Sequence, residues 1–304
     1  MAVVIRVRPP LVQLPFDLAR VAFEETARGA VPLDEPEVLR FLAGVGWRLQ
    51  RGLTPSRDAL TADEVRRAFG VNPRTAGAIV REAHDVSLQA WMEALVLPRM
   101  DAAGLDGIVR VSGTLPAPSL VLYPHAGNLL LLVTALARHA REVVVFGARG
   151  LPPKGRGAWR RSGPNRWRAA RRLAEEDRLP VRWEQDPARL AGWLAGGAAV
   201  CAAFDDRAWG RYVPVPFLGR TALLSPEPWE LAAAEGVPVI PATIVRERDK
   251  SNHVVLGASI APDLGAYLRD VAEPFLRAHP GHYATWLAEC RMRADVDDHP
   301  LFPA

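Results

Sequence analysis

The sequence contains little cysteine and no long apolar run. Only two of its 304 residues are cysteines, Cys201 and Cys290, and neither lies in a CxxC or Cys/His pattern. This spacing argues against a disulfide scaffold and against a structural zinc site, so we expect a reducing compartment. The longest apolar run, residues 129–136, is interrupted by Thr134. Because a membrane-spanning helix needs roughly 20 apolar residues, no such helix is predicted.

Signals for nucleotide binding and for secretion are also missing. Neither GxGxxG nor GxxxxGKS occurs, so no nucleotide-binding loop is expected. The first ten residues carry arginines inside their apolar stretch, at positions 6 and 8, which is not the pattern of a secretory signal. The formal net charge of +4 indicates no partner unless the basic residues cluster. These absences predict a cytoplasmic protein.

The composition is that of a folded globular protein, with 49% apolar and 24% charged residues. Up to about residue 100, apolar residues recur at three- and four-residue spacing, which predicts helices over 37–50, 62–69 and 74–100. Thr61 followed by Glu64 is a capping-box pattern that predicts a helix start, and Asn72-Pro73 predicts another.

The periodicity changes after residue 107, where short β-rich runs alternate with helical or loop segments. The runs cover residues 108–111, 119–123, 142–146, 198–204, 237–244 and 253–260. This alternation predicts an α/β fold with a mixed, largely parallel sheet flanked by helices, and active-site residues at the carboxyl ends of strands. We expect a helical segment over 1–105 packed on the core, an α/β domain over 106–294 and an irregular tail over 295–304.

A histidine stands between a predicted strand and a predicted helix. Residues 120–130 read LVLYPHAGNLL, so His125 directly follows an apolar strand and precedes an apolar helix. Such a turn exposes the imidazole and places the free N–H groups of a helix N-terminus nearby. Gly127 would let a substrate approach the backbone closely. A histidine at a strand end can equally be structural, so the motif alone leaves both interpretations open.

Several segments match one family in the same order along the chain. The segment His125-Ala126-Gly127-Asn128 is followed by Asp205 and then by VPVPFLGR at 213–220. Further matching segments are 91–93, 109–113, 143–149, 231–241 and 279–286. Together they resemble the lysophospholipid acyltransferase superfamily, in particular the lipid A biosynthesis (lauroyl or myristoyl) and phosphatidylinositol-mannoside acyltransferases. The resemblance covers residues 36–290.

The resemblance implies transfer of an acyl chain from a thioester donor, acyl-CoA or acyl carrier protein, to a hydroxyl or amine acceptor. His125 would be the general base that takes the acceptor's proton, since an alcohol is a weak nucleophile at neutral pH. Asp205 would be a second catalytic residue. No metal is implied, and no cofactor besides the acyl donor. The implied substrate-binding residues are Gly127, Asn128, Arg149, Phe217, Gly219 and Arg220.

The chain departs from the family's pattern at position 130. The family's motif is histidine, four residues, then aspartate or glutamate, and here the last position is Leu130. That carboxylate would fix the tautomer of the imidazole, and the analogous loss in a serine protease costs about 10⁴ in rate. Asp205 or Asp206 could reach His125 instead, or a more acidic acceptor could need less help. The third interpretation is a catalytically silent homologue that binds lipid or an acyl carrier.

Other interpretations of the same residues stay open. Asp205 could form a salt bridge to an arginine, with Arg207, Arg211 and Arg149 as candidates. Arg149 and Arg220 could bind phosphate or neutralise Asp205. An apolar groove beside His125 would hold the acyl chain, and its expected lining is Leu129, Leu130, Val215, Phe217 and Leu218.

A basic segment with interleaved tryptophans lies within residues 151–172. Arginine binds phosphate and tryptophan suits a membrane interface, so an anionic lipid surface, an acyl carrier protein or coenzyme A are the expected partners. Nucleic acid is the alternative for this segment alone, and a solvated surface is the third; no nucleic acid is expected as a partner of the protein. The protein could thus be peripheral on the inner face of the cell membrane. The basic residues concerned are Lys154, Arg156, Arg160, Arg161, Arg166 and Arg168.

Three residues near the C-terminus, His282, Tyr283 and Trp286, have the spacing of one side of a helix. We interpret them as packing residues.

Overall fold

The computed structural model describes residues 55–147, 171, 173–293 and 301–303. Its helices are α3 (Pro55–Phe69), α4 (Pro73–Val96), η1 (Leu97–Arg99), α5 (Ala102–Ile108), α6 (Leu129–Leu136), η3 (Pro187–Arg189), α8 (Leu190–Ala195), α9 (Glu227–Glu235), α10 (Leu264–Tyr267), η4 (Leu268–Ala272), α11 (Glu273–Ala278) and α12 (Pro280–Arg293). Its strands are β1 (Val109–Ser112), β2 (Ser119–Tyr123), β3 (Val143–Phe146), β4 (Arg182–Glu184), β5 (Ala199–Ala203), β6 (Val213–Phe217), β7 (Arg220–Leu224), β8 (Val239–Arg246) and β9 (Asn252–Leu256).

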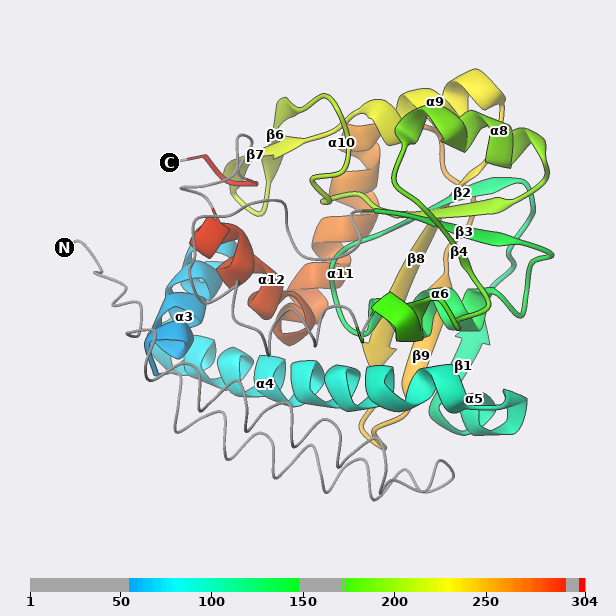
Figure 1. The fold of residues 1–304 in the computed structure, drawn as a ribbon. Helices are drawn as coiled ribbons and strands as arrows, with labels where there is room; N and C mark the ends of the chain where they lie inside the picture. The colour runs from blue at the N-terminus through cyan, green and yellow to red at the C-terminus, as the bar shows by residue number, and fades with distance from the viewer. Residues whose placement is uncertain (1–54, 148–170, 172, 294–300, 304) are drawn as a thin grey trace.

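Seven strands form one mixed sheet in the order β1-β9-β8-β2-β5-β3-β4 (Figure 1). Neighbouring strands are parallel except for β8 and β9, which are antiparallel. The parallel pairs require crossover connections, and these supply the helices that flank the sheet. The predicted α/β fold with a mixed, largely parallel sheet is confirmed.

The central strands β2, β3 and β5 are buried on both faces, and β2 shows how their residues divide between the faces. Leu120 and Leu122 join a core cluster with residues of α8, α9, α10 and α11, whereas Val121 and Tyr123 join a second cluster with residues of α5 and α6. Side chains alternate between the faces of a strand, so every residue of β2 is apolar or small and buried. The sheet is therefore the middle of three layers.

The N-terminal helices pack against the last helix of the chain. Figure 1 shows α3 and α4 grouped with α12, and an apolar cluster containing Val65, Ala76 and Ala284 joins the three. The predicted start at Asn72-Pro73 is confirmed, because the Asn72 side chain accepts a hydrogen bond from the Thr75 N–H at 2.9 Å and caps α4.

The predicted helix start at Thr61 is wrong. Thr61 and Glu64 both lie inside α3, which begins at Pro55. Glu64 is only 1% exposed and accepts a hydrogen bond from Arg220 at 2.8 Å, so it joins α3 to β7 instead of capping a helix. A capping-box pattern and an ion-pairing glutamate are indistinguishable in sequence.

A two-stranded hairpin, β6–β7, lies outside the main sheet. Its two-residue turn, Leu218-Gly219, has φ angles of 51° and 71°, and two successive positive values are typical of a type I′ turn. Leu218 is buried and its N–H donates to Glu273 at 2.8 Å, which holds a bulky residue in a backbone region it seldom occupies.

A buried polar network joins α4 to the sheet and to the start of α6. Glu93 and Arg246 form an ion pair at 2.8 Å in which each side chain is only 7% exposed. Asn128 donates to Glu93 at 2.8 Å and Asn252 donates to it at 3.1 Å. The network therefore links α4, the start of α6, β8 and β9.

The end of the chain returns to the core. Leu301 and Phe302 are buried, and the Leu301 carbonyl accepts a hydrogen bond from the Leu223 N–H at 2.8 Å. Phe302 stacks on Phe217 with ring centroids 6.3 Å apart. These two residues of the predicted irregular tail have neither helix nor strand but are packed. None of the helices in the described ranges combines the length and apolar composition needed to cross a bilayer.

Candidate active site

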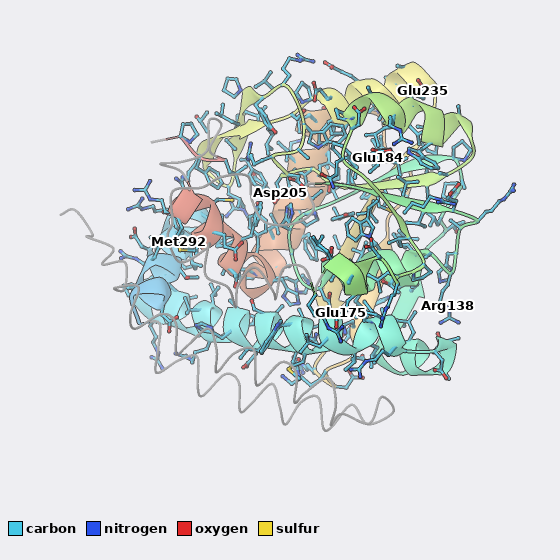
Figure 2. The ribbon with its side chains drawn as sticks, viewed as in Figure 1. Arg138, Glu175, Glu184, Asp205, Glu235 and Met292 are labelled. Atoms are coloured by element: carbon cyan, nitrogen blue, oxygen red, sulfur yellow. The ribbon has the colours of Figure 1, made fainter. Side chains whose placement is uncertain are left out.

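The register of two adjacent strands brings His125 and Asp205 together. β2 and β5 are parallel neighbours in which Tyr123 lies opposite Ala203, and the ladder continues with the Phe204 N–H donating to the Tyr123 carbonyl at 3.0 Å. His125 and Asp205 are each two residues beyond these ends. They meet at the carboxyl edge of the sheet, near the middle of the molecule, where Figure 2 labels Asp205.

The Asp205 carboxylate holds both the ring and the backbone of His125. Oδ1 of Asp205 lies 2.8 Å from Nδ1 of His125, and the His125 N–H donates to Oδ1 at 3.2 Å and to Oδ2 at 3.3 Å. An ionised carboxylate only accepts hydrogen bonds, so Nδ1 carries the proton and Nε2 carries the lone pair of the neutral ring. Nε2 has no hydrogen-bond partner among the described residues, which leaves it able to accept a proton.

Helix α12 covers the pair with two aromatic residues. The Tyr283 hydroxyl donates to Oδ2 of Asp205 at 2.8 Å, and the Trp286 ring stacks on the His125 ring with centroids 3.9 Å apart and an interplanar angle of 16°. Residues three apart share one face of a helix, so α12 presents both side chains to the same site. The Asp205 side chain is fully buried, whereas that of His125 remains 21% exposed.

The surroundings favour the protonated form of His125. Burial of the ring lowers the pKa of His125, but the charge of Asp205 and the hydrogen bond to it raise that pKa, with smaller contributions from Asp206 and Glu289. The net pKa of His125 is therefore above its ordinary value. Burial and then the Asp205 charge raise the pKa of Tyr283 well above its ordinary value, so the phenol stays a donor.

Gly127 and Asn128 make contacts within the fold, and their predicted binding of substrate stays a prediction. A Cβ on Gly127 would lie 2.9 Å from Ile244 Cγ2, and its φ of 73° favours glycine, so the close approach of β8 requires glycine at this position. The Gly127 N–H donates to the His282 carbonyl at 3.2 Å. Asn128 is 5% exposed, caps α6 by accepting from the Leu131 N–H at 3.1 Å, and donates to Glu93.

Two residues of the segment expected to bind the acyl chain, Phe217 and Leu218, lie in the core. Phe217 is fully buried, Gly219 forms the hairpin turn, and Arg220 pairs with Glu64 instead of Asp205. The five residues expected to line one groove divide between the two core clusters, which lie on opposite faces of the sheet. Val215, Phe217 and Leu218 belong to the first cluster, and Leu129 and Leu130 pack against the second.

The alternative ion pairs of Asp205 are not formed within the described residues. Arg207 donates to the Leu223 carbonyl at 2.9 Å, and Arg211 pairs with Glu230. Asp206 accepts from the N–H groups of Arg207 and Ala208 and so shapes its own turn. Of the two carboxylates considered as partners of His125, Asp205 is the one in contact.

Several predictions lie outside the described residues. These are the helix predicted over 37–50, Arg149 as a substrate-binding residue, and the basic segment expected to contact the partners. Among the residues that the structure does describe, no group of three or more histidine, cysteine, aspartate or glutamate side chains is placed to hold a metal ion.

Sequence reasoning missed Tyr283 and Trp286 as members of this site. Their three-residue spacing correctly predicts a shared helix face, but helical spacing does not identify what the face contacts. His282, the third residue of that set, accepts from the Arg246 N–H at 3.0 Å through Nε2. Burial, then the nearby His279 and Arg246, lower the pKa of His282 to about 4, so this ring is neutral and structural.

Fold and site together define an α/β protein with a His–Asp pair at the carboxyl edge of a largely parallel sheet. Comparison of the chain with family models and with curated proteins found no match.

Proposed function

We propose that the protein is an acyltransferase that moves an acyl group from a thioester donor to a hydroxyl or amine acceptor, with His125 as general base and Asp205 as its carboxylate partner. The observation that carries the proposal is the 2.8 Å contact between His125 Nδ1 and the buried Asp205, which leaves Nε2 as the basic nitrogen. The resemblance of the His125 segment to acyltransferases is the second support. Asp205 then supplies the carboxylate that Leu130 lacks.

In this mechanism Nε2 takes the proton of the acceptor while the acceptor oxygen or nitrogen attacks the thioester carbonyl. The tetrahedral intermediate collapses by breaking its carbon–sulfur bond, and the thiolate leaves with the proton from Nε2. Asp205 stays ionised and stabilises the imidazolium between the two steps. The N–H groups of Leu129 and Leu130, which have no hydrogen-bond partner in the described part of the chain, are the nearest helix N-terminal donors for the developing oxyanion.

The proposal is tested by incubating the purified protein with acyl-CoA and acyl-carrier donors and a panel of hydroxyl and amine acceptors. Release of the donor thiol, followed with a thiol reagent, reports thioester cleavage with any acceptor. Water can act as a slow acceptor when no other acceptor is present. Mass spectrometry then identifies the acylated product. Saturable donor binding without thiol release would instead support the catalytically silent homologue.

Replacing Leu130 by glutamate, which creates the family's motif, is expected not to raise the rate of acyl transfer. Nδ1 of His125 is already occupied by Asp205, and residue 130 lies in the first turn of α6 among apolar neighbours. The helix dipole would stabilise a glutamate at this position by about 0.3–1 kcal/mol, which affects the stability of the protein and not the proton transfer at His125. Initial rates of the variant and the natural protein should agree within about twofold; a tenfold gain in the variant would show that Asp205 does not replace the missing carboxylate.

A further inference from the structure

The Asp205 carboxylate has a third hydrogen-bond donor, Tyr283, which has no role in the proposed mechanism. It is fully buried, and its two oxygens receive the His125 N–H, His125 Nδ1–H and the Tyr283 hydroxyl. A buried charge is costly unless donors surround it, and hydrogen bonds to charged groups are the strong ones. Tyr283 is the only one of these donors that does not come from His125.

The Tyr283 ring is itself held in place by the core. It is fully buried and lies edge-on to Phe217, with centroids 6.5 Å apart and an interplanar angle of 80°. The hydroxyl therefore has a fixed position, and it reaches Oδ2 of Asp205 while Oδ1 faces the imidazole. Such a donor both aims the carboxylate and draws negative charge away from the oxygen that faces His125.

We propose that Tyr283 is a positioning residue for the His125–Asp205 pair: its hydroxyl holds the carboxylate against Nδ1 and moderates how strongly that carboxylate favours protonated His125. The role in catalysis rests on the proposed function, whereas the role in protonation does not. Loss of the hydroxyl leaves the negative charge of Asp205 less stabilised in the state where His125 is neutral. Deprotonation of His125 then becomes harder.

The other charged and titratable groups around the His125–Asp205 pair are the same in the natural protein and in a Tyr283 variant. Asp206 and Glu289 act on His125, and the groups that act on Tyr283 besides Asp205 are Cys290 and Arg207. Tyr267 supplies the matched control, because it is another buried tyrosine whose pKa is raised by burial and then by the Asp205 charge. Its hydroxyl donates to the Leu122 carbonyl at 3.3 Å instead of to Asp205.

The decisive measurement is an NMR titration of the full chain with isotopically labelled histidine, using a His125→Asn variant to assign the His125 ring signals. Tyr283→Phe is expected to raise the titration midpoint of His125 relative to the natural protein, while Tyr267→Phe leaves it unchanged. If Tyr283→Phe does not fold, 3-fluorotyrosine at position 283 keeps the ring and strengthens the donor, and the midpoint should fall. Identical midpoints in the natural protein and in the variant that folds would overturn the proposal.

Measuring acyl transfer as a function of pH tests the role of Tyr283 in catalysis separately from the proposed function. Acyl transfer by Tyr283→Phe should be about tenfold slower at neutral pH and recover as the pH is raised, since a tenfold change corresponds to one pH unit of protonation. A loss of rate that is equal at every pH would indicate a purely structural role and contradict the proposal. Absence of acyl transfer in the natural protein would remove the proposed function, but the titration would still decide the role of Tyr283.

Discussion

Replacing His125 by alanine is expected to abolish the proposed acyl transfer, and replacing Asp205 by asparagine to lower its rate by about 10⁴-fold, the cost of the corresponding change in a serine protease. The alanine removes the basic nitrogen. The asparagine keeps the shape of the carboxylate but can donate to Nδ1, and a ring that accepts at Nδ1 carries its proton on Nε2. Nε2 is then no longer the base.

The measurement is the initial rate of donor thiol release with product identification, made on the single variants and on the double variant. Because residues that act as one unit are not additive, the double variant should be no slower than His125→Ala alone. His84→Ala is the matched control, since His84 also contacts an aspartate, Asp58, at 2.8 Å but lies on α4. Full activity in Asp205→Asn would exclude the proposed pair, and equal losses in His84→Ala would point to a general loss of fold.

Replacing Arg246 by methionine is expected to lower the free energy of unfolding by about 3–5 kcal/mol, the usual cost of leaving one partner of a buried ion pair unpaired. The variant leaves the Glu93 side chain, 7% exposed, with only the amides of Asn128 and Asn252 as partners among the described residues. Asn128 caps the helix that follows His125, so the same change should disturb the site as well as the stability.

Urea denaturation curves of the variants and of the natural protein test this expectation. Arg110→Met provides the comparison, since Arg110 pairs with Glu247 at 3.0 Å on the surface, where such a pair contributes about 0–1 kcal/mol. Adding Glu93→Gln to Arg246→Met removes the unpaired charge and should restore part of the lost stability. A cost below about 1 kcal/mol for Arg246→Met would mean that water or a rearrangement neutralises Glu93.

Two departures from the expected elements have local physical causes. The hairpin strand β6 contains Pro214 and Pro216, which lack an N–H and so argue against a strand in sequence. Both prolines are exposed and lie on a two-stranded hairpin outside the main sheet. Their missing N–H groups therefore remove no hydrogen bond between the strands of the main sheet. The Thr61–Glu64 pattern predicted a helix start, but Glu64 is instead a buried partner of Arg220.

Local sequence patterns predict one part of the candidate site, and tertiary structure decides the other. The position of His125 between a strand and a helix could be predicted from the local pattern, since a buried apolar run and the asparagine cap are properties of adjacent residues. Asp205 was one of two candidate partners, and only the register of β2 on β5 decides between it and Asp206. The helical spacing of Tyr283 and Trp286 predicts packing residues, because nothing in that spacing identifies the surface that they face.

The amino-acid sequence alone determined the alternation of strands and helices, the α/β class and the histidine at the end of β2, because these depend on interactions between residues close in the chain. Tertiary structure alone decided that Asp205 contacts that histidine and that α12 adds a phenol and an indole to the site. It also decided that Phe217 and Leu218 lie in the core and that Arg220 pairs with Glu64. These contacts join residues that are 78 or more positions apart in the sequence. Contacts between such residues are set by strand register and helix packing, which no local pattern specifies.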